Sequence, residues 1–313
     1  MDGQTLSREV RQLINETSAS AYIDAKSTYD YIYEAVIATA ERTNAITSSQ
    51  VITTVANQSP YKLNANYMKL YLMDSQNRNY VKYNDGSNDT FLFQKTYDSI
   101  YHGNQTDSVT VPSDFTITDA AAIANITGTA GATSAVANGE ATLSDVLAPF
   151  TNVSVGDFVH NTTQDAHGIV TSVTSTSALV TALFVDTTGA SASWAISDAY
   201  IVVPQGRFQL VLDPPPSTSG HTVTVEYVAR PAAVYSPYRS YRLSPNFKGS
   251  IVKYACWAYK NRDREPNFGD IWFKAWDAQV RLMGRSINKA LGINRQGYKV
   301  SFIKRGRPSG SYR

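Results

Sequence analysis

The closest grouping of potential ligand residues in the sequence combines His160 and His167 with Asp157 and Asp165. Imidazole and carboxylate groups are common ligands for transition metals, so this grouping is compatible with a metal site. All four residues, however, stand among Gly, Asn, Thr and Gln residues that are typical of turns. Solvated loop residues explain the pattern better than a metal site does, and we therefore predict no bound metal.

Two other residues, a cysteine and an aspartate, have side chains that could act in catalysis, but their sequence surroundings do not favour a catalytic role. Cys256 lies beside Ala255 and Trp257 in a segment with helical spacing, where a buried thiol is expected. Asp213 precedes three prolines and therefore marks a turn. The sequence contains no glycine-rich phosphate loop, no Gly-x-Ser-x-Gly and no His-Glu-x-x-His. We expect no catalytic residue, no cofactor and no enzymatic activity.

The C-terminal residues combine positive charge with aromatic rings. Lysine and arginine neutralise phosphates and aromatic rings stack on bases, so contact with nucleic acid is physically reasonable. The alternating run at 300–303 also suits a segment that adds a strand to another protein or docks in its groove. A simply solvated tail is the third interpretation. The residues concerned are Lys299, Phe302, Lys304, Arg305, Arg307, Tyr312 and Arg313.

The small net charge of +2 conceals a strong asymmetry along the chain. Residues 230–313 contain 18 Lys and Arg against 4 Asp and Glu, whereas residues 1–229 contain 10 against 22. No Lys or Arg occurs between Lys95 and Arg207. Such polarisation indicates a charged partner, or neighbouring copies arranged in a fixed orientation.

Helical spacing of apolar residues occurs near both ends of the chain. Leu6, Val10, Leu13 and Ile14 share one helical face, and Ser27 is positioned to cap the helix that follows. No stretch approaches the roughly 18 apolar residues of a membrane helix, so we expect no membrane partner. The predicted helices cover residues 6–14, 28–42, 245–262 and 270–292.

Short runs of β-branched and aromatic residues occupy the middle of the chain. The segments 51–55, 68–72, 80–83, 91–93, 208–212 and 223–228 predict strands, with a hairpin turn at 84–88. From about 115 to 203 the composition shifts to Ala, Thr, Ser and Gly. Short strands there, at 158–159, 168–173, 178–183 and 200–203, are bounded by turn residues and are typical of a small barrel or sandwich.

Together these patterns predict an α+β fold. A helical bundle from the N- and C-terminal helices would combine with a β-sheet region, into which a small all-β domain, a barrel or sandwich, is inserted. The predicted organisation is a discontinuous body over 1–114 and 204–292, an inserted β-domain over 115–203, and a basic arm over 293–313.

The order of these elements resembles that of the head-to-tail adaptor proteins of tailed bacteriophages, also called neck or connector proteins. The resemblance covers residues 5–110 and 205–300. It rests on the Leu-x-x-x-Val-x-x-Leu-Ile-Asn helix, the Leu-Asp-Pro-Pro-Pro turn, the Val-Glu-Tyr-x-x-Arg-Pro strand exit at 225–231, the Trp- and Tyr-containing helix pair at 254–287 and the basic tail.

The resemblance implies a structural virion protein at the head–tail junction, assembled in the host cytoplasm. It implies a homo-oligomeric ring, usually of twelve copies, through which double-stranded DNA passes with weak, non-specific contacts. The portal protein and a tail, tail-terminator or nozzle protein would be its partners. Residues 293–313, with the seven residues named above, would dock on the portal. Lys253, Lys260, Arg281 and Arg285 would be inter-subunit or channel-facing charges.

Two other classes of protein share parts of this pattern. A different phage component, such as a tail, baseplate or decoration protein, would also suit the Thr- and Ser-rich β middle. A nucleic-acid-binding protein acting alone would suit the basic tail, and it would bind DNA strongly and with a steep dependence on salt.

Overall fold

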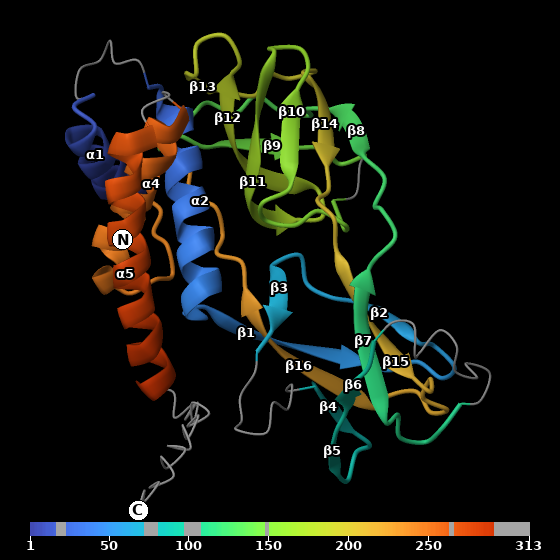
Figure 1. Ribbon diagram of the computed structural model, residues 1–313. Coiled ribbons are helices and arrows are strands. Elements are labelled where there is room, and N and C mark those ends of the chain that lie inside the picture. Colours follow the sequence, from blue (N-terminus) through green and yellow to red (C-terminus); the bar gives the residue numbers. More distant parts are fainter. Residues whose placement is uncertain (17–22, 72–80, 97–107, 148–149, 263–265, 291–313) are drawn as a thin grey trace, which may run out of the picture.

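The computed structural model describes residues 1–16, 23–71, 81–96, 108–147, 150–262 and 266–290. In this part of the chain a layer of helices lies along one side of three β-sheets (Figure 1). The helical layer consists of α1 (Gly3–Leu13), α2 (Ala25–Thr43), α4 (Lys248–Arg262) and α5 (Pro266–Ala290), with a 3₁₀ turn at Pro245–Phe247.

Aspartate side chains fix where the first two helices begin. The carboxylate of Asp2 accepts a hydrogen bond from the backbone N–H of Thr5 at 2.7 Å. Asp24 does the same for Ser27 at 2.6 Å, so Asp24 and not the predicted Ser27 is the N-cap of α2. Each cap satisfies a backbone donor that the first helical turn would leave unpaired.

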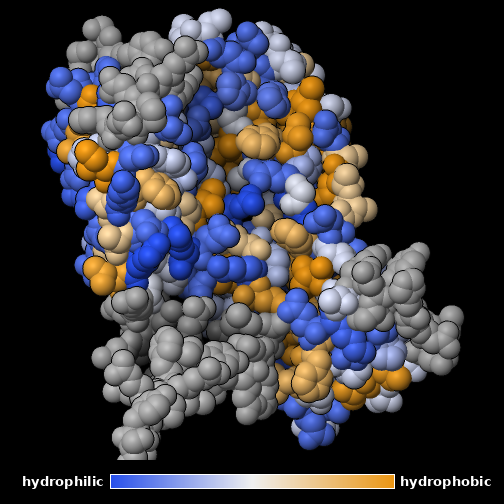
Figure 2. Space-filling model, viewed as in Figure 1, coloured by the Kyte–Doolittle hydropathy of each residue, from blue (hydrophilic) through white to orange (hydrophobic). Residues whose placement is uncertain are grey.

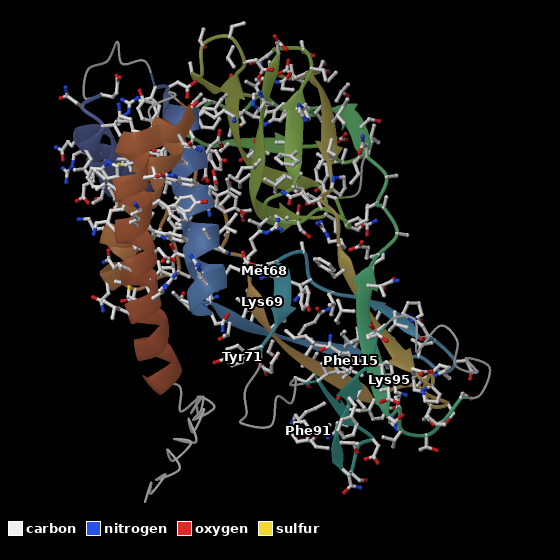
Figure 3. All side chains as sticks on the ribbon, viewed as in Figure 1. Met68, Lys69, Tyr71, Phe91, Lys95 and Phe115 are labelled. Carbon is white, nitrogen blue, oxygen red and sulfur yellow. The ribbon has the colours of Figure 1, made fainter. Side chains whose placement is uncertain are left out.

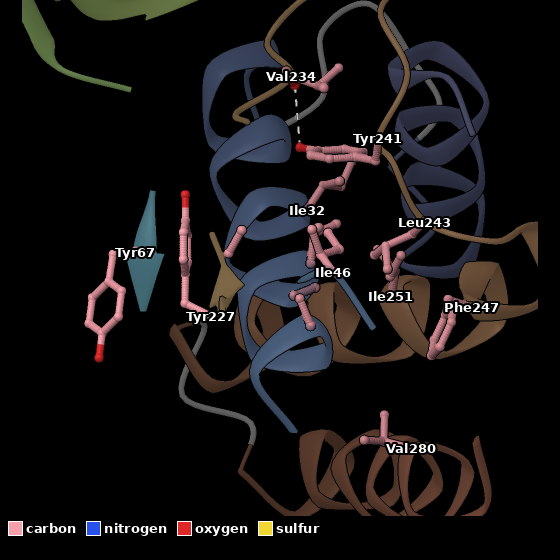
Figure 4. Packing of buried hydrophobic residues seen from close by; sticks show 14 of the residues in the cluster. Ile32, Ile46, Tyr67, Tyr227, Val234, Tyr241, Leu243, Phe247, Ile251 and Val280 are labelled. Carbon is pink, nitrogen blue, oxygen red and sulfur yellow. Dashed lines mark hydrogen bonds between the residues drawn. The ribbon is translucent and has the colours of Figure 1, made fainter. Parts of the chain in front are cut away.

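The helical layer is held together by apolar and aromatic side chains (Figure 4). Ile32 and Val36 on α2 and Ile251 on α4 are fully buried, and each such side chain contributes roughly 1.5–3 kcal/mol. Trp276 on α5 lies 4.9 Å from Tyr254 between ring centroids and donates to Thr39 Oγ1 at 3.1 Å. These contacts fix α5 against both α2 and α4.

Two of the sheets form a half-barrel. One has the order β1 (Thr47–Thr53), β16 (Thr222–Ala229), β4 (Val81–Asn84), β5 (Asp89–Phe91), with β3 (Tyr67–Leu70) also paired to β16. The other has the order β2 (Pro60–Lys62), β15 (Phe208–Asp213), β7 (Asp114–Asp119), β6 (Phe93–Gln94).

The segment between β5 and β6 is one of those that pass from one sheet of the half-barrel to the other. Leu92, between β5 and β6, donates its N–H to Val81 O at 3.0 Å, and Phe93 donates to Ser113 O at 3.0 Å. The Leu92 side chain is buried between the sheets. Alternate residues of β16 and β15 point inward as well, which accounts for the period-two pattern in their sequences. These inward-facing residues are Val223, Val225, Tyr227, Leu210 and Leu212.

The third sheet is formed by a continuous part of the chain, residues 126–203, which we call the insert. Its order is β13 (Ser191–Ala192), β12 (Ala178–Val185), β11 (Ala166–Ser175), β10 (Phe158–Asn161), β14 (Ala199–Val203), β8 (Ile126–Thr129), with β9 (Ala141–Ser144) also paired to β12. It has a hydrophobic core of its own. There the Trp194 indole donates to Thr181 Oγ1 at 2.9 Å, and Tyr200 donates to Asp145 Oδ2 at 2.8 Å.

The insert leaves and rejoins the half-barrel at neighbouring strand ends. β7 and β15 are antiparallel, with Asp119 opposite Phe208, and Ala120 N–H donates to Arg207 O at 2.9 Å. All of β7 except Asp114 falls within the predicted insert range of 115–203, but β7 pairs with β15 and β6 and so belongs to a sheet of the half-barrel.

A small cluster of buried side chains connects the insert to the helical layer. Phe184 of β12 packs against Tyr235, with 6.0 Å between ring centroids, and Tyr29 of α2 joins the same cluster. The Tyr235 hydroxyl also donates to Asp30 Oδ1 on α2. The insert therefore rests on α2 and on the segment after β16.

The predicted fold class, an α+β fold based on a helical bundle, is wrong. The part of the chain that the structure describes is mainly β, with sixteen strands in three sheets and four α-helices that form one lateral layer. The error has a physical cause. Strands of two to four residues, such as β2, β8, β9 and β13, are too short to show a period, so the sheets were underestimated beside the strongly periodic helices.

Candidate functional site

The predicted inter-subunit or channel charges are distributed over α4 and α5. Lys253 Nζ donates to Gln279 Oε1 at 3.2 Å, so this lysine connects the two helices. Lys260 Nζ lies 5.6 Å from the centroid of the Tyr259 ring. Arg281 forms an ion pair with Asp277 at 2.8 Å, one helical turn away. Each of the three charges engages a different partner.

Asp277 is the acidic centre of a small network that joins α5 to α2. It also pairs with Arg42 of α2 at 2.6 Å, and the Arg42 guanidinium lies 5.3 Å from the Trp276 ring centroid. The Arg281 side chain keeps 67% of its surface exposed, and such an exposed pair contributes little to stability. Arg281 therefore remains accessible to a neighbouring molecule.

The predicted portal-docking residues and the side chain of one predicted charge lie outside the described part of the chain. The backbone of Arg285 is part of α5, while its side chain lies outside the described residues. The seven docking residues also lie outside the described residues; they are Lys299, Phe302, Lys304, Arg305, Arg307, Tyr312 and Arg313.

The grouping of His and Asp residues is divided by the fold. His160 and His167 are opposite each other in β10 and β11, with 6.3 Å between ring centroids, and His167 Nδ1 contacts Asp186 Oδ1. Asp157 instead pairs with an arginine on another segment. Over the described ranges, no three His, Cys, Asp or Glu side chains lie close enough to hold a metal ion.

Cys256 and Asp213 are both buried. Cys256 is fully buried within the helical layer, and burial raises the pKa of its thiol to about 12. Asp213 lies opposite Asp114 at the end of the β15–β7 pair. Burial raises the pKa of Asp213, while Lys95, which bonds to Asp114 at 2.6 Å, acts in the opposite direction.

A polar cluster between the insert and the half-barrel was not predicted from the sequence. We call it the junction cluster, and it comprises Asp157, Gln205, Arg207 and Arg230. Arg207 Nη2 donates to both carboxylate oxygens of Asp157, at 3.0 and 2.9 Å. Asp157 is 1% exposed and Arg207 is 8% exposed, so this ion pair is almost completely removed from water.

Gln205 connects the ion pair to the second arginine. Its backbone N–H donates to Asp157 Oδ1 at 3.0 Å, and its side-chain amide donates to Gly156 O. Its side-chain oxygen accepts a hydrogen bond from Arg230 Nη1 at 2.7 Å. The guanidinium groups of Arg207 and Arg230 are thus held on either side of one glutamine.

The junction cluster lines a cavity of about 270 Å³. Its walls come from the insert, from α2 and from the segments that flank the strands of the half-barrel. A signal for the cluster was present in the sequence, because Arg207 is the first basic residue after a long stretch without any. Its partner could not be inferred, since Asp157 is fifty residues away in the chain.

Exposed apolar side chains occur on the half-barrel and on α5. Phe93 of β6 is 67% exposed and Val51 of β1 is 64% exposed, and both belong to edge strands. Phe91 lies on β5, at the far end of the half-barrel from the insert (Figure 3). On the face shown in Figure 2, hydrophobic and hydrophilic side chains are interspersed. Edge strands with exposed apolar residues are suited to contact with another chain.

No helix in the described part of the chain has both the length and the hydropathy required to cross a lipid bilayer. Compared with models of known protein families and with curated proteins, the sequence matches none.

Proposed function

We propose that this protein is a structural adaptor at the head–tail junction of a tailed-phage virion. In this proposal the chain forms a homo-oligomeric ring around the DNA channel, with the portal on one side and a tail, tail-terminator or nozzle protein on the other. Assembly takes place in the host cytoplasm. One observation carries the proposal: oppositely charged parts of the chain are attached to opposite ends of the helical layer.

The acidic end of the helical layer is the end at the insert. The backbone at Gly189, between β12 and β13, lies against the Asp24 side chain at the start of α2. The insert belongs to the stretch between Lys95 and Arg207 that contains no basic residue. A partner bound at the insert would therefore meet a surface without lysine or arginine side chains of the insert, on which Asp165 and Asp186 are the exposed carboxylates.

The basic end of the helical layer is the end at which α5 stops. Gly284 lies close to Thr43, the last residue of α2, so α5 runs away from the insert (Figure 1). The basic residues 291–313 follow α5 in the sequence. A connector must contact two different neighbours along its axis, and a subunit with two chemically different ends supports that role.

Chemical cross-linking with mass spectrometry on native particles that contain this protein tests the proposal. We expect links from Lys299 and Lys304 to a portal protein. Links only to major capsid or tail-tube subunits would assign the chain to another virion component, such as a tail, baseplate or decoration protein. Absence of the chain from every particle would contradict a virion role altogether.

A truncation separates portal docking from folding. A chain that ends at Gly292 is expected to fold and to lose attachment to the portal ring. The matched control carries residues 293–313 in scrambled order, which preserves their charge and composition. Normal attachment of the truncated chain would remove the docking role from this segment.

The basic, aromatic tail also favours a second candidate function, that of a nucleic-acid-binding protein acting alone. Such a protein would bind double-stranded DNA tightly as a monomer, with an affinity that falls steeply as salt is increased. An adaptor is expected to bind DNA weakly, because the DNA must slide through the ring. Filter binding of the isolated chain at two salt concentrations distinguishes these functions.

A further inference from the structure

One face of α1 forms a polar groove together with α2. The groove has a volume of about 360 Å³, and every side chain that lines it can donate a hydrogen bond. The residues from α1 follow one another at intervals of three or four, which places them on the same side of the helix. The lining residues are Gln4, Ser7, Arg8, Arg11 and Gln12 of α1 and Tyr29 of α2. Two guanidinium groups and no carboxylate therefore surround this groove.

The positive charge of the groove is not neutralised by the carboxylates around it. Arg8 is exposed, and its side chain has no ion-pair or hydrogen-bond partner among the described residues. The neighbouring carboxylates are engaged elsewhere, because Asp2 caps α1, Asp24 caps α2 and Glu9 forms an ion pair with Lys248. None of these three carboxylates lines the groove. An anion that enters the groove therefore meets two arginines without competing with an acidic side chain of the groove itself.

Two of the lining side chains are held in place. Arg11 Nη2 donates to Ile23 O at 2.6 Å, which fixes its guanidinium between α1 and the start of α2. Tyr29 is 8% exposed, and over the described ranges its hydroxyl is neither hydrogen-bonded nor among the polar atoms that the fold closes off from solvent. Burial raises the pKa of this phenol, while the Arg11 cation lowers it and Asp2 raises it. The Tyr29 hydroxyl is therefore a protonated donor with no acceptor in the described part of the chain.

This set of side chains matches one chemical group in particular. Arginine, glutamine, serine and tyrosine are side chains with which proteins contact the phosphate oxygens of nucleic acids, and the planar guanidinium fits two oxygens of a phosphate. We propose that the groove binds a phosphate group, with Arg8 and Arg11 neutralising its charge and the Tyr29 hydroxyl donating a hydrogen bond to it. The site belongs to a single chain and does not depend on ring assembly.

The phosphate has two possible sources, the backbone of DNA and a free phosphate ion. Fluorescence anisotropy of a short labelled duplex of mixed sequence, titrated with the full chain at several salt concentrations, tests the first source. Arg8→Gln should weaken the affinity about three- to tenfold and reduce the slope of log K against log salt by about 1, because one phosphate contact is lost. Arg8→Lys retains the charge and should retain the slope.

A matched control separates this groove from the general charge of the protein. Lys62→Gln removes the same charge from an exposed side chain on β2 of the half-barrel, which lies in a different part of the molecule from α1 (Figure 1). This variant should leave both affinity and slope unchanged. The midpoint of urea unfolding should be the same for Arg8→Gln and the wild type, because the Arg8 side chain has no partner in the described part of the chain.

Isothermal titration calorimetry of the full chain with inorganic phosphate, at matched ionic strength, tests the second source. One site per chain that Arg8→Gln and Tyr29→Phe both weaken, while neither variant alters DNA binding, would identify the free ion as the ligand. Tyr29→Phe removes only the hydroxyl and keeps the buried ring. Absence of phosphate binding together with an unchanged DNA slope in Arg8→Gln would overturn the proposal, and so would an equal loss of binding in Lys62→Gln.

Discussion

Asp157 and Arg207 form a buried ion pair across the boundary between the insert and the half-barrel. Asp157 precedes β10 of the insert, and Arg207 immediately precedes β15 of the half-barrel. The contact is 2.9 Å long, and both side chains are almost completely buried. The loop before β10 is thus tied to the point where the chain returns to the half-barrel.

Replacing Asp157 by alanine should strongly destabilise the protein. The variant leaves the Arg207 guanidinium buried without its counter-charge, which typically costs about 3–5 kcal/mol. The midpoint of urea unfolding, followed by circular dichroism, measures the effect. The double variant Asp157→Leu/Arg207→Met should recover only part of the loss, because the backbone N–H groups of Ser154 and Gln205 still lose the acceptor that Asp157 provides. Lys26→Ala, which removes an i,i+4 surface pair with Asp30, should cost only about 0.3–0.5 kcal/mol.

Replacing residues 121–206 by Asn-Gly should leave a body that still unfolds cooperatively. The new two-residue turn joins β7 to β15, which already pair in antiparallel register. The midpoint of thermal unfolding should fall, since Tyr29 and Tyr235 lose their contact with Phe184. The excised segment should fold by itself around Trp194. A body without a cooperative transition would show that the half-barrel depends on the insert.

Asp2→Ala should destabilise the protein by about 1 kcal/mol at neutral pH, because α1 loses its N-cap. The backbone N–H of Thr5 lowers the pKa of Asp2 below its ordinary value of 3.8. The carboxylate therefore stabilises the fold fully above that value, and the effect is lost as pH falls through the lowered pKa. Unfolding midpoints from pH 7 to pH 2 test this. Asp2→Asn keeps a capping oxygen and should show a weaker dependence on pH.

Cys256 should resist alkylation in the native protein. Its thiol has a pKa of about 12 and is fully buried, so very little of the reactive thiolate is present at pH 8. Iodoacetamide labelling, followed by intact mass, should show no adduct in buffer and one adduct in concentrated urea. Labelling in buffer at the rate of a free thiol would contradict the packing of α4.

Most of the helices and the longer strands could be located from the sequence. Their arrangement in space could be predicted to a much smaller extent. Leu6 and Val10 are buried as their spacing predicts, but Leu13, on the same predicted face, is 48% exposed. The turn at 84–88 does join two paired strands, because Asn84 lies opposite Asp89. Helix faces and hairpin turns depend on residues that are close in the sequence, and the spacing of apolar and turn residues therefore predicts them.

Contacts between distant residues were beyond prediction. The Asp157–Arg207 pair, the Arg230–Gln205 bond and the Tyr235–Asp30 bond each join segments that only the finished topology brings together. Gly168 shows the same limitation. A Cβ at this position would lie 1.8 Å from Ala182 O on the adjacent strand, so β11 requires glycine there. Nothing in the residues around Gly168 indicates how close that strand is.

The pairing of β7 with β15 has a consequence for the order in which the chain folds. The insert consists of consecutive residues with its own core, so its contacts can form early. The β7–β15 pair must instead close a loop that contains the whole insert. Closing such a long loop has an entropic cost. Folding of the insert brings the end of β7 close to the start of β15 and removes most of this loop-closure cost. We therefore expect the insert to fold before the half-barrel, and mutations in the Trp194 core to slow closure of the half-barrel as well.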